Sequence, residues 1–315
     1  MQESEKELRE VAKKLLLEKK VDLIIGYEEG TLPLRTRPIF IREADETKKL
    51  VWNFRCENNL CFYLKMAKER VGIVAKGCDI RSIIGLIKER QIKRENIFII
   101  GVPCSGIIDR KKIEDILEGR ELLEGIESDS QIILKGEGLE EKVDKDKLVH
   151  ASCKSCKYRN PVLYDTLIGK EVSQGEGEEY SDVEEFASKS DNERWAYFND
   201  EASRCIRCYA CRNVCPACYC PQCFVDQSLP TWFGRTLHPS DTLIFHIIRT
   251  LHIAGRCVDC GACSRVCPMN IELRMLNKKA EKDVKELYHY EAGISLEELP
   301  PMATFKMDDP QEFIK

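Results

Sequence analysis

Short apolar runs alternate with amphipathic segments along the first half of the chain. Residues 5–19 have the spacing of a charged amphipathic helix, and the apolar run at 21–26 is typical of a strand. A second strand is expected at 37–41, behind a proline-rich turn. Residues 136–147 are charged and polar, so we expect a surface loop there.

One strand–loop–helix pattern occurs twice. The strands and helices are expected at 71–75 and 79–90, and again at 97–102 and near 111–118. Strands that alternate with helices imply right-handed crossovers and a mainly parallel sheet. Cys78 and Cys104 come just after the two strands, and open α/β sheets bind ligands at the carboxyl ends of their strands. We therefore expect both cysteines to face one site.

The last third of the chain has a helical pattern. Residues 238–252 place apolar residues on one broad helix face, and Ser240 can cap this helix. A charged helix is expected at 271–287, and the end from Pro300 is expected to lie as a tail over a surface.

An acidic stretch separates the two patterns. Residues 171–188 include seven acidic residues and no Lys or Arg, which indicates an exposed linker or an acidic loop within one domain. The sequence thus predicts an α/β N-terminal domain with a mainly parallel sheet and a mainly α-helical C-terminal domain. The expected parts are an α/β domain at 1–170, an acidic linker at 171–193, a helical domain at 194–290 and a tail at 291–315.

Composition and charge narrow the functional class. A chain of 315 residues with 43% hydrophobic residues can build two packed domains. The net charge of −5 offers no basic footprint for nucleic acid. The first ten residues are too charged for a signal peptide, and the longest apolar runs are too short to cross a bilayer. We expect a cytoplasmic protein without direct membrane insertion.

The chain contains seventeen cysteines, and this number is the best indication of its chemistry. Secreted disulfide scaffolds can be this rich in cysteine, but they are short and carry signal peptides. A long chain in a reducing cytoplasm needs another use for its thiols. Thiolate ligation of metal is that use, and an anaerobic cell is the expected setting.

Two runs have the spacing Cys-x2-Cys-x2-Cys-x3-Cys-Pro. In two-cluster ferredoxins three thiolates of such a run hold one 4Fe–4S cluster, and the fourth ligates the other cluster. One cluster is therefore assigned to Cys205, Cys208, Cys211 and Cys267, and the other to Cys257, Cys260, Cys263 and Cys215. The alternative is a pair of zinc ribbons, which do not need the third and fourth cysteines or the proline.

Shared ligands make the two clusters neighbours, so an electron can pass between them. The long helical segment between the runs resembles the α-helical ferredoxin module of heterodisulfide reductase and succinate dehydrogenase iron–sulfur subunits. His246 and His252 lie on this segment, and we expect them to be core or surface residues rather than ligands.

A further resemblance covers roughly residues 10–170. It rests on Val71-Gly-Ile-Val-Ala-Lys-Gly-Cys78, Ile99-Ile-Gly-Val-Pro-Cys104 and Cys153-Lys-Ser-Cys156. This succession resembles the beta subunits of deazaflavin-dependent hydrogenases and formate dehydrogenases. The resemblance implies that Cys78, Cys104, Cys153 and Cys156 hold a third 4Fe–4S cluster beside a flavin. The alternative is buried structural cysteines with an isolated zinc pair.

Two questions stay open. Members of that family open with a Gly-Gly loop that this chain lacks, and the loop at Gly30 is the only one near the expected place, so FAD binding is undecided. Five cysteines also have no assigned role and could hold a further metal or be spare: Cys56, Cys61, Cys218, Cys220 and Cys223.

The expected function is electron relay within a larger oxidoreductase. Phosphate-binding and dinucleotide fingerprints are missing from the sequence, as is a nucleophile–base arrangement. The resemblance implies other subunits as partners, in a formate dehydrogenase, a hydrogenase or a heterodisulfide-reductase-like complex. The alternatives are a flavin-containing subunit that exchanges hydride with a deazaflavin or nicotinamide carrier, and a zinc-stabilised adaptor without redox function.

Overall fold

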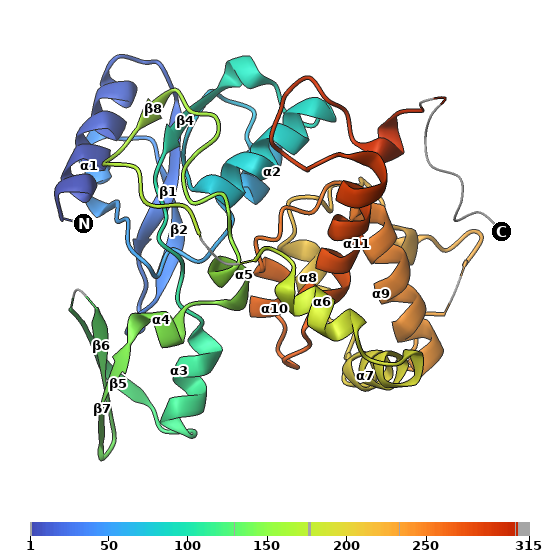
Figure 1. Cartoon of the computed structure of the whole chain (residues 1–315). Coiled ribbons are helices and arrows are strands. Elements are labelled where there is room, and N and C mark those ends of the chain that lie inside the picture. Colours follow the sequence, from blue (N-terminus) through green and yellow to red (C-terminus); the bar gives the residue numbers. More distant parts are fainter. Residues whose placement is uncertain (1, 129, 176–177, 233, 306, 308–315) are drawn as a thin grey trace. The chain divides into compact units, whose positions relative to one another are not determined.

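The computed structural model describes residues 2–128, 130–175, 178–232, 234–305 and 307 (Figure 1). The chain folds as two compact units. Unit 1 comprises Met1–Ile80 and Ile92–Gly177, and unit 2 comprises Arg81–Gln91 and Glu178–Lys315. Part of the expected acidic linker, at 176–177, and the end of the expected tail, at 308–315, lie outside the described residues.

Unit 1 is built on a five-stranded sheet in the order β2-β1-β3-β4-β8. Its strands are β1 (Leu23–Glu29), β2 (Thr36–Ile41), β3 (Val71–Ala75), β4 (Ile97–Gly101) and β8 (Thr166–Leu167). Only the β1–β2 pair is antiparallel, which confirms a mainly parallel sheet. All five residues of β3 are buried, as expected for a strand covered on both faces.

Three of the helices that begin in unit 1 lie where the sequence pattern predicts them, and the two short ones at 145–148 and 151–154 were not predicted. The α-helices that begin in unit 1 are α1 (Gln2–Leu17), α2 (Gly77–Lys88), α3 (Arg110–Leu117), α4 (Lys145–Leu148) and α5 (Ala151–Lys154). Helix α1 buries Leu8, Ala12 and Leu15, which share one helix face. Helix α2 starts directly after β3 in unit 1, and its residues from Arg81 onward belong to unit 2.

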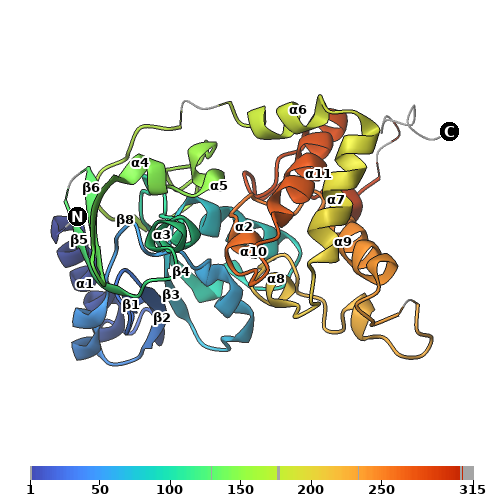
Figure 2. The ribbon, with the colours of Figure 1, turned by 90° about the horizontal axis from the view of Figure 1, so that it is seen from below.

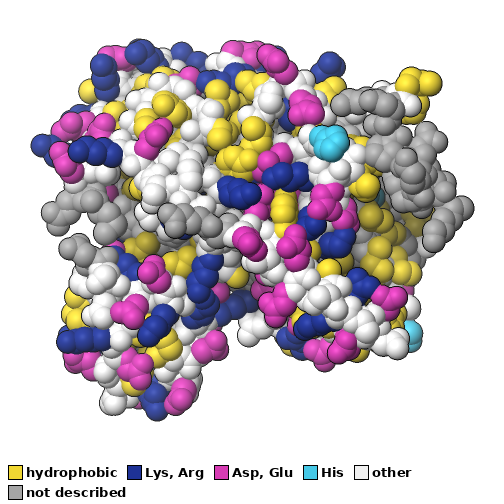
Figure 3. All heavy atoms as spheres, viewed as in Figure 1, with side chains coloured by type: hydrophobic (Ala, Val, Ile, Leu, Met, Phe, Trp, Pro, Cys, Tyr) yellow, Lys and Arg dark blue, Asp and Glu magenta, His cyan; other side chains and the backbone are white. Residues whose placement is uncertain are grey.

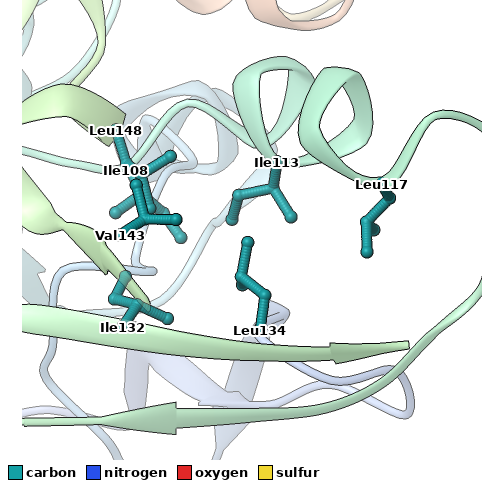
Figure 4. Packing of buried hydrophobic residues seen from close by; sticks show 7 residues of the cluster. All are labelled: Ile108, Ile113, Leu117, Ile132, Leu134, Val143 and Leu148. Carbon is teal, nitrogen blue, oxygen red and sulfur yellow. The ribbon is translucent and has the colours of Figure 1, made fainter. Parts of the chain in front are cut away.

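A second, antiparallel sheet occupies the place where a surface loop was expected. Its strands are β5 (Leu122–Glu127), β6 (Gln131–Gly136) and β7 (Leu139–Asp144). The loop prediction for 136–147 is therefore wrong. Figure 4 shows Ile132 and Leu134 of β6 facing α3. The exposed face of β7 carries charged residues, so its two inward apolar residues were too few to show a strand period.

The described residues of unit 2 form helices and connecting loops without a strand. Its helices are α6 (Ser181–Ala187), α7 (Asp191–Ser203), α8 (Ala210–Asn213), α9 (Pro239–Ile253), α10 (Ala262–Arg265) and α11 (Leu273–Tyr288). The helices expected at 238–252 and 271–287 are confirmed as α9 and α11. Figure 2 shows α6, α7, α9 and α11 grouped together. Helix α6 lies within the acidic stretch, and its Val183 is buried, so that part of the stretch belongs to the fold of unit 2.

Short 3-10 helices complete the two units. They span Ala44–Lys49, Leu60–Met66, Arg94–Asn96, Phe224–Asp226 and Pro301–Ala303.

Helix α9 differs from expectation in two ways. Its cap is His238, whose Nδ1 accepts a hydrogen bond from the Ser240 amide, so the capping assignment to Ser240 is wrong. Its buried face is also mixed in character. His246 and Arg249 are buried there, whereas Leu251 is 56% exposed. Buried polar side chains need hydrogen-bond or charge partners. The partners of His246 and Arg249 therefore bear on the function of this helix.

None of the described helices combines the length and the apolar character needed to cross a bilayer. On the face shown in Figure 3, basic and acidic side chains are interspersed.

Candidate metal centre

The two cysteine runs of unit 2 follow the same backbone course. Arg207 and Tyr209 in the first run have φ of 50° and 59°, and Asp259 and Gly261 at the equivalent positions have φ of 50° and 69°. Each loop then enters a one-turn helix, α8 or α10, and these two helices contact each other. Three of the four left-handed residues are not glycine, a conformation that structures tolerate mainly at functional loops.

One cavity of about 50 Å³ in unit 2 is lined by Cys215, Cys257, Cys260 and Cys263. Three of these cysteines come from the second run and one from the first, which is the crossed set expected from the spacing. The cavity is larger than the 10–15 Å³ or so that one water molecule needs. The fold thus places four cysteines, from two distant segments, around one cavity.

The other set gathers in an apolar cluster of unit 2. Cys211 and Cys267 are buried against Phe245, and Cys205 packs on the same cluster. The amide of Arg207 lies 3.4 Å from the Sγ of Cys205, the kind of N–H···S contact that stabilises a thiolate. Cys208 is exposed, so one corner of this set lies at the surface of the unit.

Burial shifts the acidity of these thiols. It raises the pKa of Cys211 to about 12 and that of Cys263 to about 11, while Arg249 acts in the opposite direction on both. Such thiols keep their protons at neutral pH unless a metal replaces them. The site is therefore suited to a metal that supplies positive charge inside the protein.

Thiol spacing distinguishes a cluster from a single ion. In a tetrahedral zinc site, with Zn–S bonds of about 2.3 Å, the sulfur atoms lie less than about 4 Å apart. Among the described residues, three ligand atoms within 4.8 Å of one another occur only at Glu179, Glu281 and Glu291. No trio of cysteine sulfur atoms among these residues meets that spacing.

The glutamate trio has partners of its own. Lys285 contacts Glu179 at 2.9 Å and Glu291 at 3.1 Å, and Tyr180 donates a hydrogen bond to Glu281. We therefore interpret the trio as part of an ion-pair network.

In unit 1, Cys78 and Cys104 follow the carboxyl ends of the neighbouring parallel strands β3 and β4. The amide of Cys104 donates to the carbonyl of Arg159 at 2.9 Å. Burial and the neighbouring Cys153 and Cys156 raise the pKa of Cys104 to about 12. The structure thus brings Cys104, Cys153 and Cys156 together and places Cys78 at the end of the adjacent strand.

Two glycines allow this close packing. A Cβ at Gly77 would collide with the carbonyl oxygen of Tyr158, and one at Gly106 would lie 3.5 Å from the Cβ of Cys153. Gly106 also has φ of 118°, which favours glycine. Both loops after the strands therefore meet the segment that carries Cys153 and Cys156.

A buried ion pair next to these cysteines was missed by the sequence reasoning. Lys76 and Asp79 are 3% and 0% exposed, with Nζ 2.9 Å from the carboxylate. Lys76 also donates to the hydroxyl of Tyr27 at 2.8 Å. Burial lowers the pKa of Lys76, but Asp79 and Tyr27 together hold it well above its ordinary value. The signal was present as a lysine directly after a buried strand, two residues before Cys78.

Two curated proteins are similar to this chain over nearly its whole length. The chain is 26% identical to the F420-dependent formate dehydrogenase subunit beta of Methanocaldococcus jannaschii, over 92% of each chain. It is 25% identical to the F420-dependent formate dehydrogenase 1 subunit beta of Methanococcus maripaludis, over 91% of this chain and 90% of that one. The chain thus resembles the beta subunits of F420-dependent formate dehydrogenases over nearly its whole length. The resemblance inferred from the cysteine segments is thereby confirmed.

Other comparisons are more limited. A segment of 75 residues is 35% identical to a Sinorhizobium fredii ferredoxin, of which it covers 70%. A chain of the F420-reducing [NiFe] hydrogenase complex from Methanosarcina barkeri is 16% identical with a TM-score of 0.37, over 48% of this chain and 58% of that one. Protein-family models gave no match.

The cysteines without an assigned role fall into two groups. Cys56 and Cys61 are fully buried within unit 1, and the amide of Asn53 lies 3.5 Å from the Cys56 Sγ, so both are packed core residues. Cys218, Cys220 and Cys223 lie in unit 2. Cys218 contacts Cys215, whose thiol lowers the pKa of Cys218, whereas Cys220 is exposed.

We predict that Gly77→Ala damages the cysteine site of unit 1 selectively. The added methyl group forces the Tyr158 segment away from β3, which we expect to destabilise unit 1 by about 1–3 kcal/mol and to weaken metal retention there. Iron analysis after mild chelation measures this effect. Lys13→Ala, an exposed change on α1 of the same unit, is the control and should retain iron like the wild type. Equal iron retention in both variants would contradict the packing argument.

Proposed function

We propose that this chain is an iron–sulfur electron-transfer subunit of an anaerobic oxidoreductase, with two 4Fe–4S clusters in unit 2 and a third in unit 1. One observation carries the proposal: the cavity of unit 2 collects Cys257, Cys260 and Cys263 of one run together with Cys215 of the other. This crossing is the ligand pattern of two-cluster ferredoxins.

The chain's own residues prepare these sites for one-electron chemistry. When bound, 4Fe–4S clusters accept and release single electrons. The apolar cluster around Phe245 shields Cys211 and Cys267 from water. On the other set, Nδ2 of Asn277 lies 3.6 Å from the Sγ of Cys263. Burial and N–H···S contacts of this kind adjust reduction potentials without rearranging the protein.

The resemblance to these beta subunits supports a place inside a complex. Both curated relatives are beta subunits of F420-dependent formate dehydrogenases, and this chain covers at least 90% of each. We therefore propose a formate dehydrogenase catalytic subunit as the partner. The exposed Cys208 suggests that electrons enter or leave unit 2 through the set to which it belongs.

Electron paramagnetic resonance of the anaerobically purified protein tests the relay. Because the two ligand sets of unit 2 share their loops, reduction should give a spin-coupled pair of signals, and the third cluster a separate one. Two magnetically isolated signals from unit 2, or a colourless protein that contains zinc, would contradict the proposal.

A further inference from the structure

We propose that Arg249 is the shared counter-charge of the two clusters in unit 2 and raises the reduction potential of both. This inference rests on the proposed function, because it assumes that the two cysteine sets hold clusters. Arg249 is a positioning residue, since it ligates neither cluster.

The position of Arg249 connects both sets. It lies on α9 and is 4% exposed. Its Nη2 donates a hydrogen bond of 3.1 Å to the main-chain carbonyl of Cys211, in the first set. The same side chain lines the cavity that holds the thiols of the second set.

Arg249 differs from the other arginines that line this cavity. Arg274 is paired with Asp259 at 2.7 Å, Arg256 with Glu89 at 2.6 Å, and Arg81 with Glu291 at 3.5 Å. Within the described part of the chain, Arg249 forms no ion pair with a carboxylate, and its buried Nε has no hydrogen-bond partner.

A buried guanidinium without an anionic partner is strongly unfavourable. The anionic groups within its reach are thiolates. The Arg249 side chain lines the cavity together with Cys215 and Cys263 and bonds the main chain of Cys211. The thiolates of the bound clusters would thus supply the negative charge that no carboxylate of the described residues supplies to Arg249.

This arrangement has an electrochemical consequence. Reduction adds one negative charge to a cluster, and a fixed cation nearby stabilises the reduced state more than the oxidised state. Since Arg249 faces both sets, it raises both potentials together. The difference between the two potentials therefore changes less than either potential alone.

Potentiometric titration of Arg249→Gln, followed by electron paramagnetic resonance, tests the inference on the full chain. We expect both unit 2 potentials to fall so that the reduced-to-oxidised ratio at a fixed potential drops at least about tenfold, which corresponds to 59 mV for a one-electron couple. Arg249→Lys keeps the charge and should retain most of the wild-type potential. Arg194→Gln, a surface change on α7, should leave both potentials unchanged.

Full iron content in Arg249→Gln with unchanged potentials would overturn the inference and leave the relay function intact. A wild-type protein without iron would instead refute the relay function itself. If Arg249→Gln fails to retain iron, pulsed resonance of the wild type with isotope-labelled arginine decides the matter. A nitrogen coupling to the reduced clusters that disappears in Arg249→Lys supports the inference, and no such difference contradicts it.

Discussion

Replacing Cys260 with serine should remove one cluster from unit 2, about four iron atoms per chain. Cys260 lines the cavity with Cys215, Cys257 and Cys263, so its loss opens one corner of that set. The spin-coupled pair of signals should collapse to a single uncoupled one, and electron transfer through the subunit should fall to background. Iron and sulfide analysis with resonance spectroscopy of the reduced protein measures both effects.

Cys220→Ser is the matched control for this experiment. Cys220 lies in the same unit but is exposed and belongs to neither set. It should therefore keep its full iron content. A Cys260→Ser protein that retains all its iron, or that passes electrons at the normal rate with the cluster absent, would show that the relay assignment is wrong.

The second large effect is expected in unit 1. Replacing Cys153 with serine should remove about four further irons and leave the coupled signals of unit 2 intact. The reason is that Cys153 lies with Cys104 and Cys156 in one compact unit, and the ferredoxin-type sets lie in the other. Iron content and the signals of the reduced variant separate the two contributions.

Cys56→Ala controls for the loss of a thiol from the same unit. Cys56 is fully buried in the core of unit 1, so its truncation should lower stability by about 1–2 kcal/mol without loss of iron. Should Cys153→Ser keep the iron of the wild type, or release zinc instead, the third cluster assigned to unit 1 would be refuted.

The sequence predicted the parts of the fold whose patterns are local. Buried strands such as β3 and β4 have continuous apolar runs, and their alternation with helices implied the parallel sheet that the structure shows. The antiparallel sheet was missed because β7 presents a charged face to solvent and only Leu139 and Val143 to its core. A strand with so few apolar residues looks like a loop until its partner strand is known.

The candidate ligand sets rest on a different kind of signal. The spacing in the two runs is typical of cluster ligands, so the sequence alone predicted which cysteines should meet. Residues that approach these cysteines from distant segments have no comparable spacing pattern in the sequence. Arg249 lies near both sets because the buried face of α9 contains polar as well as apolar residues. The sequence pattern suggested that this face is apolar, so it gave no indication of a buried cation. Lys76 likewise acquires its role from Asp79 and Tyr27, which the fold brings to it.

The most direct test of the account is the content of iron, sulfide, zinc and flavin in anaerobically purified protein. We expect about twelve irons and as many sulfides per chain, without stoichiometric zinc. Twelve irons together with one FAD would keep the clusters and move the function towards a flavin-containing reductase. Stoichiometric zinc in place of iron would contradict the account.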